Sequence, residues 1–346
     1  MLTPSRAILG SALVTVWALG ASQAAAQTAP ACKEMRKINV GVSVAPPNVV
    51  HTTPYVAREL GLFKKYCVDA NIMQFEGGSS ATSMAAVAQG TAIANVTDVA
   101  IGRGIKAKQV WGFAPRLPQS YVVAPGITKP EELKGKRLSA SGGGVGSFNW
   151  RMGRFFLVKG GLKVEDANFI SQGLAGRLPG LVTNQIDGVA LHPEDVYLAK
   201  KQRPDVNILG VLANEMPDIM FNAYGASEAF IAKNRDTLID TIAAMIEANR
   251  TMYEAPEKVL PIIVKETGKD REAVEFAMGD LTKNCVWSIN TGLDPKRSAA
   301  TIEESVRNGD IEAGKNLTHE QLVDLSIADA AVKKAGGVKT IKGCSN

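Results

Sequence analysis

The sequence predicts an α/β fold with a mainly parallel sheet, built as two consecutive blocks of strands and helices with a helical C-terminal tail. Strand-like runs alternate with helical segments in two blocks of similar size, residues 37–120 and 124–222. Loops rich in glycine and hydroxyl residues follow several of these strands, and only helical segments follow Ser227. The 346 residues, 45% hydrophobic and 21% charged, have ordinary globular composition and are enough for two domains or lobes.

Residues 1–26 have the features of a secretory signal peptide. Arg6 supplies the positive start, Ala7–Leu19 is a mostly apolar run, and Ala24-Ala25-Ala26 fits the small-residue cleavage rule. No other segment reaches the ~18 apolar residues of a membrane span. We therefore expect a soluble periplasmic protein that begins near Gln27. Lipidation of Cys32 is an alternative, although the preceding residues 28–31 lack the leucine usual at such sites.

In the first block the run from Ile38 to Val42 alternates like a strand and leads into a loop. Thr53 is a favourable N-cap residue and Pro54 a favourable first residue of a helix. The loop Gly77–Ser80 opens a second helix, and Thr97-Asp98 opens a third. The block is thus expected to contain these elements: strand Ile38–Val42, helix Tyr55–Leu60, strand Val68–Phe75, helix Ala81–Gln89, strand Ala92–Val96 and a helix after Asp98.

The second block repeats the pattern, with Gly160-Gly161 ending its first long helix. Its expected strands are Tyr121–Ala124, Lys136–Ala140, Ala167–Ile170, Ile186–Leu191, Val206–Leu212 and Ile219–Ala223, and its helices begin at Phe148 and Gly176. The expected tail helices are Ser227–Asn234, Asp236–Tyr253, Pro256–Glu266, Arg271–Lys283, Pro295–Asn308 and Thr318–Ile327, the last with a capping box formed by Thr318 and Gln321.

The loop Ser141–Ser147, which reads Ser-Gly-Gly-Gly-Val-Gly-Ser, lies between a predicted strand and the helix from Phe148. Glycines let the backbone approach a ligand closely, and the helix start offers unpaired N–H groups to a carboxylate, sulfonate, phosphate or carbonyl oxygen. Such a loop can also be only a tight connection. It matches neither the P-loop, because no Lys follows the glycines, nor Gly-x-Gly-x-x-Gly, so neither ATP nor NAD is indicated.

The charge distribution and the spacing of the cysteines argue against nucleic-acid binding and against a metal site. The net charge of +5 is scattered rather than clustered, which does not favour nucleic-acid binding. The four cysteines suggest disulfides in an exported chain, whereas their wide spacing and only three histidines do not indicate a metal site. Three pairings are possible and the sequence does not choose among them. Our hypothesis is Cys32–Cys67 and Cys285–Cys344, each closing a loop near one terminus.

Four motifs occur in a characteristic order: the segment from Gly61 to Asp69, Ala88-Gln89-Gly90 before a strand, Glu132–Arg137 before the glycine loop, and Gln185-Ile186-Asp187-Gly188. Together they resemble exported solute-binding proteins of ABC transporters, in the SsuA/NMT1-like branch for sulfonates, nitrate, taurine and thiamine precursors. The resemblance covers roughly residues 37–250. The chain departs from the family pattern at Ala92-Ile93, where an acidic residue is absent, and at Cys67, which replaces a glycine. These departures leave the identity of the ligand open.

The resemblance implies a type II periplasmic-binding-protein fold, with two α/β lobes joined by two crossover strands near Val122–Ala124 and Phe221–Tyr224. Lobe 1 would be residues 27–122 plus 225–346, and lobe 2 residues 123–224. The lobes would close by a hinge motion over a small organic ligand. The chain would act as a monomer that passes its ligand to an ABC permease, without a cofactor, a metal or catalysis.

The resemblance implies, by matching positions, these ligand-binding residues: Ser43, His51, Thr52, Gly78, Ser79, Thr97, Asp98, Ser141, Gly146, Ser147, Phe148, His192, Asp195, Asn222 and Tyr224. Ser147 and nearby amides would take an anionic or carbonyl oxygen, and His51 or Tyr224 would contact a planar ligand. Simpler readings exist: His51 as a loop surface residue, His192 and Asp195 as caps at a strand end, and Asp98 as a helix N-cap.

Two other functions are compatible with this fold. Thiamine-pyrimidine synthases share it but use a cysteine cluster that is absent here, and Gly-x-Ser-x-Gly and H-E-x-x-H motifs are also absent. A binding protein for a TRAP-type or sensory membrane partner is the third reading. The net basic charge and the glycine–serine helix start favour an anionic ligand such as a sulfonate or carboxylate, while an aromatic carboxylate or a neutral pyrimidine stays open.

Overall fold

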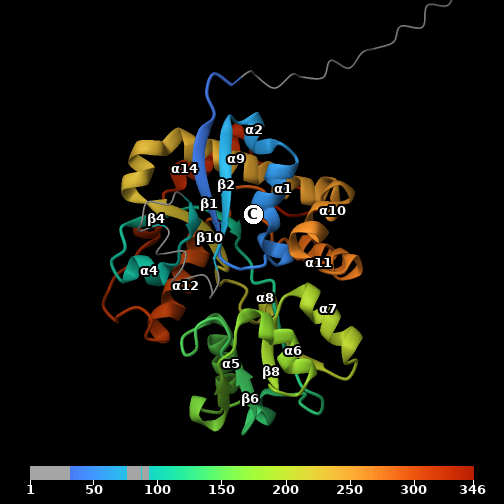
Figure 1. The fold of residues 1–346 in the computed structure, drawn as a ribbon. Helices are drawn as coiled ribbons and strands as arrows, with labels where there is room; N and C mark the ends of the chain where they lie inside the picture. Colours follow the sequence, from blue (N-terminus) through green and yellow to red (C-terminus); the bar gives the residue numbers. More distant parts are fainter. Residues whose placement is uncertain (1–31, 76–86, 88–92) are drawn as a thin grey trace, which may run out of the picture. The chain divides into compact units, whose positions relative to one another are not determined.

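The computed structural model describes residues 32–75, 87 and 93–346, and in this part of the chain the strands form a mixed α/β arrangement (Figure 1). Strand β1 (Arg36–Val42) pairs in parallel with β2 (Val68–Gln74). A parallel bridge between Val40 and Ile93 connects β1 to the next sheet, in which β10 (Asn222–Ser227) pairs antiparallel with β3 (Ala94–Asn95) and β4 (Ala107–Ala114).

A separate five-stranded sheet has the order β7-β6-β8-β5-β9. Its strands are β5 (Ser120–Val123), β6 (Arg137–Ser139), β7 (Asn168–Ile170), β8 (Gly188–Leu191) and β9 (Asn207–Val211). Strands β6, β7 and β8 run parallel, as expected for strands joined through helices, whereas β5 lies antiparallel to β8 and β9. Parallel pairing is thus present between β1 and β2 and among β6, β7 and β8, as expected. Strand β5, the first after the chain enters the five-stranded sheet, and β10, the first after it leaves, pair only antiparallel, so the sheets are mixed rather than mainly parallel.

Separate hydrophobic cores accompany the five-stranded sheet and the two smaller sheets of β1–β4 and β10. One core joins residues between Ile38 and Ala114 with residues between Tyr224 and Cys344, and the other cores of the central segment lie between Leu117 and Met216. We call residues 117–216 the central half, and the described residues of 32–114 and 222–346 the terminal half. In Figure 1 the central half contains β6, β8 and α5–α7, and the terminal half contains β1, β2 and α9–α11. The exact lobe boundaries at 122/123 and 224/225 stay a prediction.

The helices of the central half are α5 (Phe148–Lys159), α6 (Arg177–Val182), α7 (Pro193–Gln202) and α8 (Leu212–Glu215), with short 3₁₀ turns at Pro130–Leu133, Val164–Asp166 and Leu174–Gly176. The helix expected from Gly176 is present as α6. Helix α7 was not expected, although Pro193 at its first position and Glu194 and Asp195 in its first turn are recognised start signals.

In the terminal half, the 3₁₀ turn Val49–Thr52 leads into α1 (Thr53–Glu59), and α2 (Leu62–Lys65) and α4 (Asp98–Gly102) follow. The tail helices are α9 (Glu228–Glu254), α10 (Pro256–Thr267), α11 (Arg271–Lys283), α12 (Pro295–Arg307), α13 (His319–Leu322) and α14 (Leu325–Lys334). The two helices expected at 227–234 and 236–253 are one helix, α9, with a kink at Asn234, where φ is −129°. The single helix expected at Thr318–Ile327 was wrong: the chain is extended at Val323, which forms a parallel bridge with Gln109 of β4, so that α13 ends at Leu322 and α14 begins at Leu325.

Both hypothesised disulfides are present, Cys32–Cys67 and Cys285–Cys344, and all four cysteines are thus paired. The first ties the start of the described chain to the residue before β2, and the second ties the end of α11 to the C-terminus. A thiol in a disulfide is not free to carry a lipid, so the lipidation alternative for Cys32 is not supported. The expected signal peptide, residues 1–26, lies outside the described residues.

Candidate functional site

A cavity of about 590 Å³ lies between the two halves and is lined by residues of both. The terminal half contributes the loop after β1, the start of α4, the start of β10 and one face of α12, and the central half contributes the glycine loop with the start of α5 and the end of β8. Most of the predicted site residues line this cavity: Ser43, His51, Thr97, Asp98, Ser141, Gly146, Ser147, Phe148, His192 and Asn222.

Three predicted residues lie away from the cavity wall. Thr52 is fully buried and donates its hydroxyl to the carbonyl oxygen of Val49 at 2.7 Å. Tyr224 is a core residue whose ring stacks on Trp111 with centroids 6.2 Å apart. Asp195 lies behind the wall, where it contacts two cations. Gly78 and Ser79 fall outside the described residues.

The glycine loop has the geometry that its sequence predicts. Gly142, Gly143, Gly144 and Gly146 all have positive φ, between 74° and 129°, a region that side chains disfavour. Ser147 is the N-cap of α5, and its hydroxyl accepts a hydrogen bond from the Trp150 N–H at 3.3 Å. The first N–H groups of α5 have no acceptor within the helix, so this end is suited to hold an anionic oxygen.

Two buried histidines of the cavity lining, His51 and His192, lie beside each other in an edge arrangement, with ring centroids 6.2 Å apart. His51 contacts Asn48 through Nδ1 and Asn222 Nδ2 through Nε2 at 3.1 Å, and His192 Nε2 lies 3.2 Å from Gln119 Nε2. Burial, reinforced by the charge of Arg177, lowers the pKa of His51 to about 3 and the pKa of His192 well below its usual value. Both rings are therefore neutral at physiological pH and act through hydrogen bonds rather than charge.

Aromatic and aliphatic side chains form the apolar part of the wall. The ring of Phe221 lies 6.1 Å from Phe148, 5.9 Å from His51 and 6.0 Å from His192, measured between centroids. Further apolar lining comes from Leu117, Met152, Leu174, Met216, Ile219 and Met220. This combination of rings and flexible methionines suits a planar or apolar ligand body.

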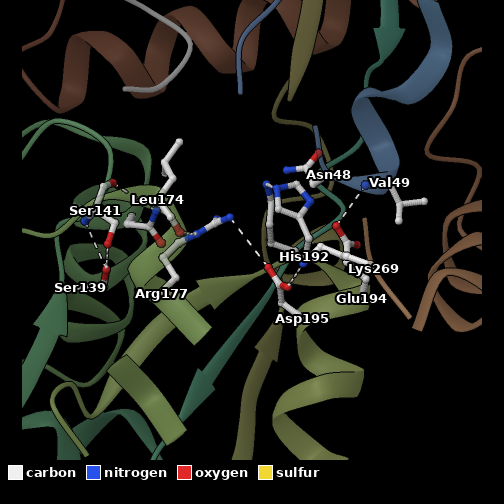
Figure 2. A network of polar contacts seen from close by, with 12 residues as sticks. Asn48, Val49, Ser139, Ser141, Leu174, Arg177, His192, Glu194, Asp195 and Lys269 are labelled. Atoms are coloured by element: carbon white, nitrogen blue, oxygen red, sulfur yellow. Dashed lines mark hydrogen bonds and ion pairs between the residues drawn. The ribbon is translucent and has the colours of Figure 1, made fainter. Parts of the chain in front are cut away.

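Arg177 supplies a buried positive charge to the cavity. It is only 8% exposed, and its Nε donates to the carbonyl oxygen of Leu174 at 3.0 Å. Figure 2 shows the guanidinium between Ser141 and Asp195, with its Nη2 4.0 Å from the Asp195 carboxylate. Asp195 in turn accepts from Lys269 Nζ at 2.5 Å. Of the two carboxyl groups that act on Arg177, Asp195 is shared with a lysine, and burial raises the pKa of Glu194 to about 7. Arg177 therefore retains charge that can attract an anion.

The cavity lining also contains carboxyl groups, arginines and other polar side chains outside the Arg177–Asp195 contact. Asp98 is 6% exposed, and burial raises the pKa of its carboxyl group, although a hydrogen bond from Ser305 opposes the shift. Nearby, Arg151 pairs with Asp310 at 3.4 Å and donates to the carbonyl oxygen of Gly146 at 3.0 Å. The lining around Asp98 therefore differs in chemistry from the lining around Arg177.

Sequence reasoning missed several lining residues for identifiable reasons. Arg177 follows a glycine, and nothing in the local pattern signals that its charge is buried. Phe221 was placed only as a crossover residue. The polar stripe of α12 could have been found, since Thr301, Glu304, Ser305 and Asn308 recur at helical spacing on one face.

Within the described residues, no group of histidine, cysteine and carboxylate side chains is arranged to hold a metal ion. A helix long and apolar enough to cross a membrane is likewise not found among them. The site is therefore described by its hydrogen-bonding groups, its buried charges and its apolar wall.

Solved structures with this fold include periplasmic binding proteins. A protein of Bordetella bronchiseptica is 22% identical, with a TM-score of 0.71 over 87% of this chain and 98% of that one. The alkanesulfonate-binding protein SsuA of Xanthomonas axonopodis pv. citri, solved with MOPS, is 13% identical, with a TM-score of 0.64 over 84% and 99%. The nitrate-binding protein NrtA of Synechocystis is 13% identical, with a TM-score of 0.67 over 87% and 88%.

The fold is also used by an enzyme. The desulfurization enzyme DszB is 13% identical, with a TM-score of 0.61 over 86% of this chain and 99% of the enzyme. At these identities the similarity shows a common fold, and the chemistry has to be argued from the site. Among curated protein sequences no match to this chain is found.

A family model described as NMT1/THI5 like matches residues 48–259, which is more than half of the chain. The match includes the loop with His51, the glycine loop, Arg177 and the end of β8 with His192. It also spans both passages of the chain between the two halves. The chain therefore belongs to the NMT1/THI5-like family, with the fold of the periplasmic binding proteins.

Proposed function

We propose that this protein captures a small organic anion in the cavity between its two halves and delivers it to an ABC permease outside the cytoplasm. The buried guanidinium of Arg177, beside the glycine loop at the start of α5, is the observation that favours an anion. A charge-assisted hydrogen bond from arginine and the N–H groups of a helix start are complementary to a carboxylate or sulfonate.

The side chains of the cavity wall indicate what the remainder of the ligand, apart from its acid group, would be. Phe148 and Phe221 offer ring faces, neutral His51 and His192 offer hydrogen bonds, and the volume of about 590 Å³ lies in the range of small-molecule sites. A flat or aliphatic body would pack against these rings while its acid group reaches Arg177. This reasoning favours an aromatic carboxylate or an organic sulfonate over a bare inorganic ion.

Two of the solved structures with this fold support a role in transport. SsuA of Xanthomonas is an alkanesulfonate-binding protein, and NrtA of Synechocystis is a periplasmic nitrate-binding protein. Delivery to a permease, residence in the periplasm and a monomeric state are part of our proposal for this chain. A TRAP-type or sensory partner is the alternative, and neighbouring genes for a permease and an ATPase would separate the two.

An enzymatic role is the second alternative because DszB shares the fold. The cysteines offer no nucleophile for it, since all four are in disulfides. The two cavity histidines are neutral and hydrogen-bonded to asparagine or glutamine rather than to a nucleophile with a carboxylate behind it. We therefore propose a binding protein and not an enzyme.

A thermal-shift screen of the mature protein tests the proposal. The panel contains alkyl and aryl sulfonates, aromatic carboxylates, nitrate and thiamine pyrimidines, because a ligand that binds the native state raises its melting temperature. We expect one class of organic acid to raise it, and Arg177→Gln to weaken that binding by at least about tenfold, since hydrogen bonds to charged groups contribute about 1.5–3 kcal/mol. Binding of only neutral pyrimidines, unaffected by Arg177→Gln, would overturn the anion assignment.

A further inference from the structure

Asp195 lies at the meeting point of two cations that come from different halves of the molecule (Figure 2). Its Oδ2 lies 4.0 Å from Arg177 Nη2, within the central half, and its Oδ1 lies 2.5 Å from Lys269 Nζ, which belongs to the terminal half. All three side chains are substantially buried, with exposures of 9% for Asp195, 10% for Arg177 and 24% for Lys269. Water therefore screens their interactions only weakly.

Lys269 reaches Asp195 only because two helices of different halves pack together. It lies in the connection between α10 and α11, and α11 packs along α7, which carries Asp195 in its first turn. Beside this contact, Glu194 Oε1 accepts a hydrogen bond from the Val49 N–H at 3.1 Å, again between the halves. If the halves separate, Asp195 loses Lys269 but keeps Arg177, because both of these residues belong to the central half.

The charges around Arg177 can be compared with the two halves together and with the two halves separated. With the halves together, Arg177 and Lys269 are positive, Asp195 is negative and both cavity histidines are neutral. Glu194 also lies near Arg177, and because burial raises the pKa of its carboxyl group to about 7, it keeps its proton below that pH. One positive charge is then left for a ligand. Without Lys269, the carboxylate of Asp195 is left to Arg177 alone and cancels its charge. The anion would then meet a paired guanidinium rather than a free one.

We propose that Lys269 is a positioning residue for ligand binding: by engaging Asp195 across the interface, it frees the charge of Arg177 for the anion. Closure and anion affinity are coupled because the terminal half neutralises the carboxylate that otherwise competes with the ligand. This inference rests on the proposed function, since it assumes that an anion binds at Arg177. It differs from a simple latch, in which Lys269 and Asp195 would only hold the halves together.

The two possibilities predict opposite behaviour in a double-mutant cycle. The probes are 1-propanesulfonate, benzoate and nitrate, titrated calorimetrically into the mature protein in a buffer free of sulfonates. We call the proposed effect of Lys269 on Arg177 charge release. If it operates, Lys269→Met weakens probe binding by about tenfold or more, whereas Asp195→Asn does not weaken it. The double variant regains affinity to within about threefold of the wild type, because the competing carboxylate is gone. Lys269→Arg, which keeps the charge, retains binding.

If Lys269 and Asp195 only hold the halves together, both single variants weaken probe binding. The double variant then binds the probes no more tightly than Lys269→Met does. That result overturns the inference while leaving anion capture in place. If no probe binds the wild type, both the inference and the proposed anion function are overturned. Thermal unfolding of each ligand-free variant verifies that it is folded.

The matched control is the exposed pair of Lys201 with Glu272, which joins the same two helices at 2.9 Å. Both side chains are more than half exposed and lie outside the cavity lining. Lys201→Met therefore removes a lysine from the α7–α11 interface without touching Asp195. We expect it to change probe affinity by less than about twofold, and a loss equal to that of Lys269→Met would contradict the charge-release account.

Discussion

At the scale of single residues, burial decides which ionisable side chains of the cavity are charged. His51 and His192 are held neutral, while Arg177 is a buried cation of the cavity because a guanidinium keeps its proton in proteins. The sequence allowed the two histidines to be proposed as site residues, because both lie in loops at predicted strand ends, and both line the cavity. It did not allow their protonation state, or the burial of Arg177, to be predicted, because both depend on residues brought together by the fold.

Glu194 gives a pH-dependent prediction. Burial, and secondly the charge of Asp195, raise the pKa of this carboxyl group to about 7. The folded protein thus holds a proton that the unfolded chain releases near pH 4.5, so the stabilisation is present below pH 4.5 and is lost as the pH rises towards 7. Over that window the free energy of unfolding of the wild type should fall by up to about 3 kcal/mol.

The variant Glu194→Gln should remove this dependence, because an amide does not titrate. In urea unfolding it should be more stable than the wild type at pH 8 and about equal to it at pH 5. Glu303→Gln, at an exposed position of α12, is the control and should leave the profile unchanged. If the free energy of unfolding depends on pH in the same way for Glu194→Gln and the wild type, Glu194 is not the titrating group.

At the scale of elements, predictions succeeded where local chemistry decides the structure. The glycine loop, its Ser147 cap, the strands on either side and the amphipathic tail helices follow from residues close in sequence. Strand β4 was missed because Lys108, Gln109 and Gly112 interrupt its apolar pattern, although nearly all of it is buried. Gln109 is accommodated there because its amide nitrogen donates to the Val96 carbonyl oxygen at 2.8 Å, a contact that the sequence does not reveal.

The role of Ser147 can be separated into capping and binding. Ser147→Ala should lower the free energy of unfolding by about 1 kcal/mol, the usual value of a lost N-cap. Ser227→Ala is the matched control, since Ser227 caps α9 in the same way, through Phe230 N at 3.2 Å, and is not part of the cavity lining. If the backbone amides hold the ligand, both variants keep its affinity within about threefold. A much larger loss for Ser147→Ala alone would assign the hydroxyl a direct contact.

Close backbone packing at Gly112 provides a second prediction at this scale. A methyl group there would lie 2.1 Å from the carbonyl oxygen of Gly292, a distance that requires the backbone to move. Gly112→Ala should therefore destabilise the protein by several kcal/mol in urea unfolding, in the upper part of the range for single substitutions. Gly279→Ala, in α11 with no atom within 4 Å, should instead stabilise it by about 0.5–1 kcal/mol. Equal effects at the two sites would contradict this packing.

At the scale of the whole molecule, two disulfides tie the ends of the described chain to the terminal half. They link residues separated by 35 and 59 positions, and loops of these lengths correspond to about 4 kcal/mol each in the chain-entropy model. The double substitution Cys285→Ser with Cys344→Ser should lower the melting temperature by several degrees, measured by scanning calorimetry. Ligand affinity should stay within about twofold, because this disulfide is not part of the cavity lining.

The central claim is that an organic anion lies against Arg177 and the glycine loop between the two halves. A crystal structure of the mature protein with the strongest ligand of the thermal-shift panel tests it most directly. We predict that the acid group accepts from Arg177 and from the N–H groups at the start of α5, with the ligand body against Phe148 and Phe221. An acid group bound outside this cavity, or beside Asp98 with Arg177 left to Asp195, would contradict the account.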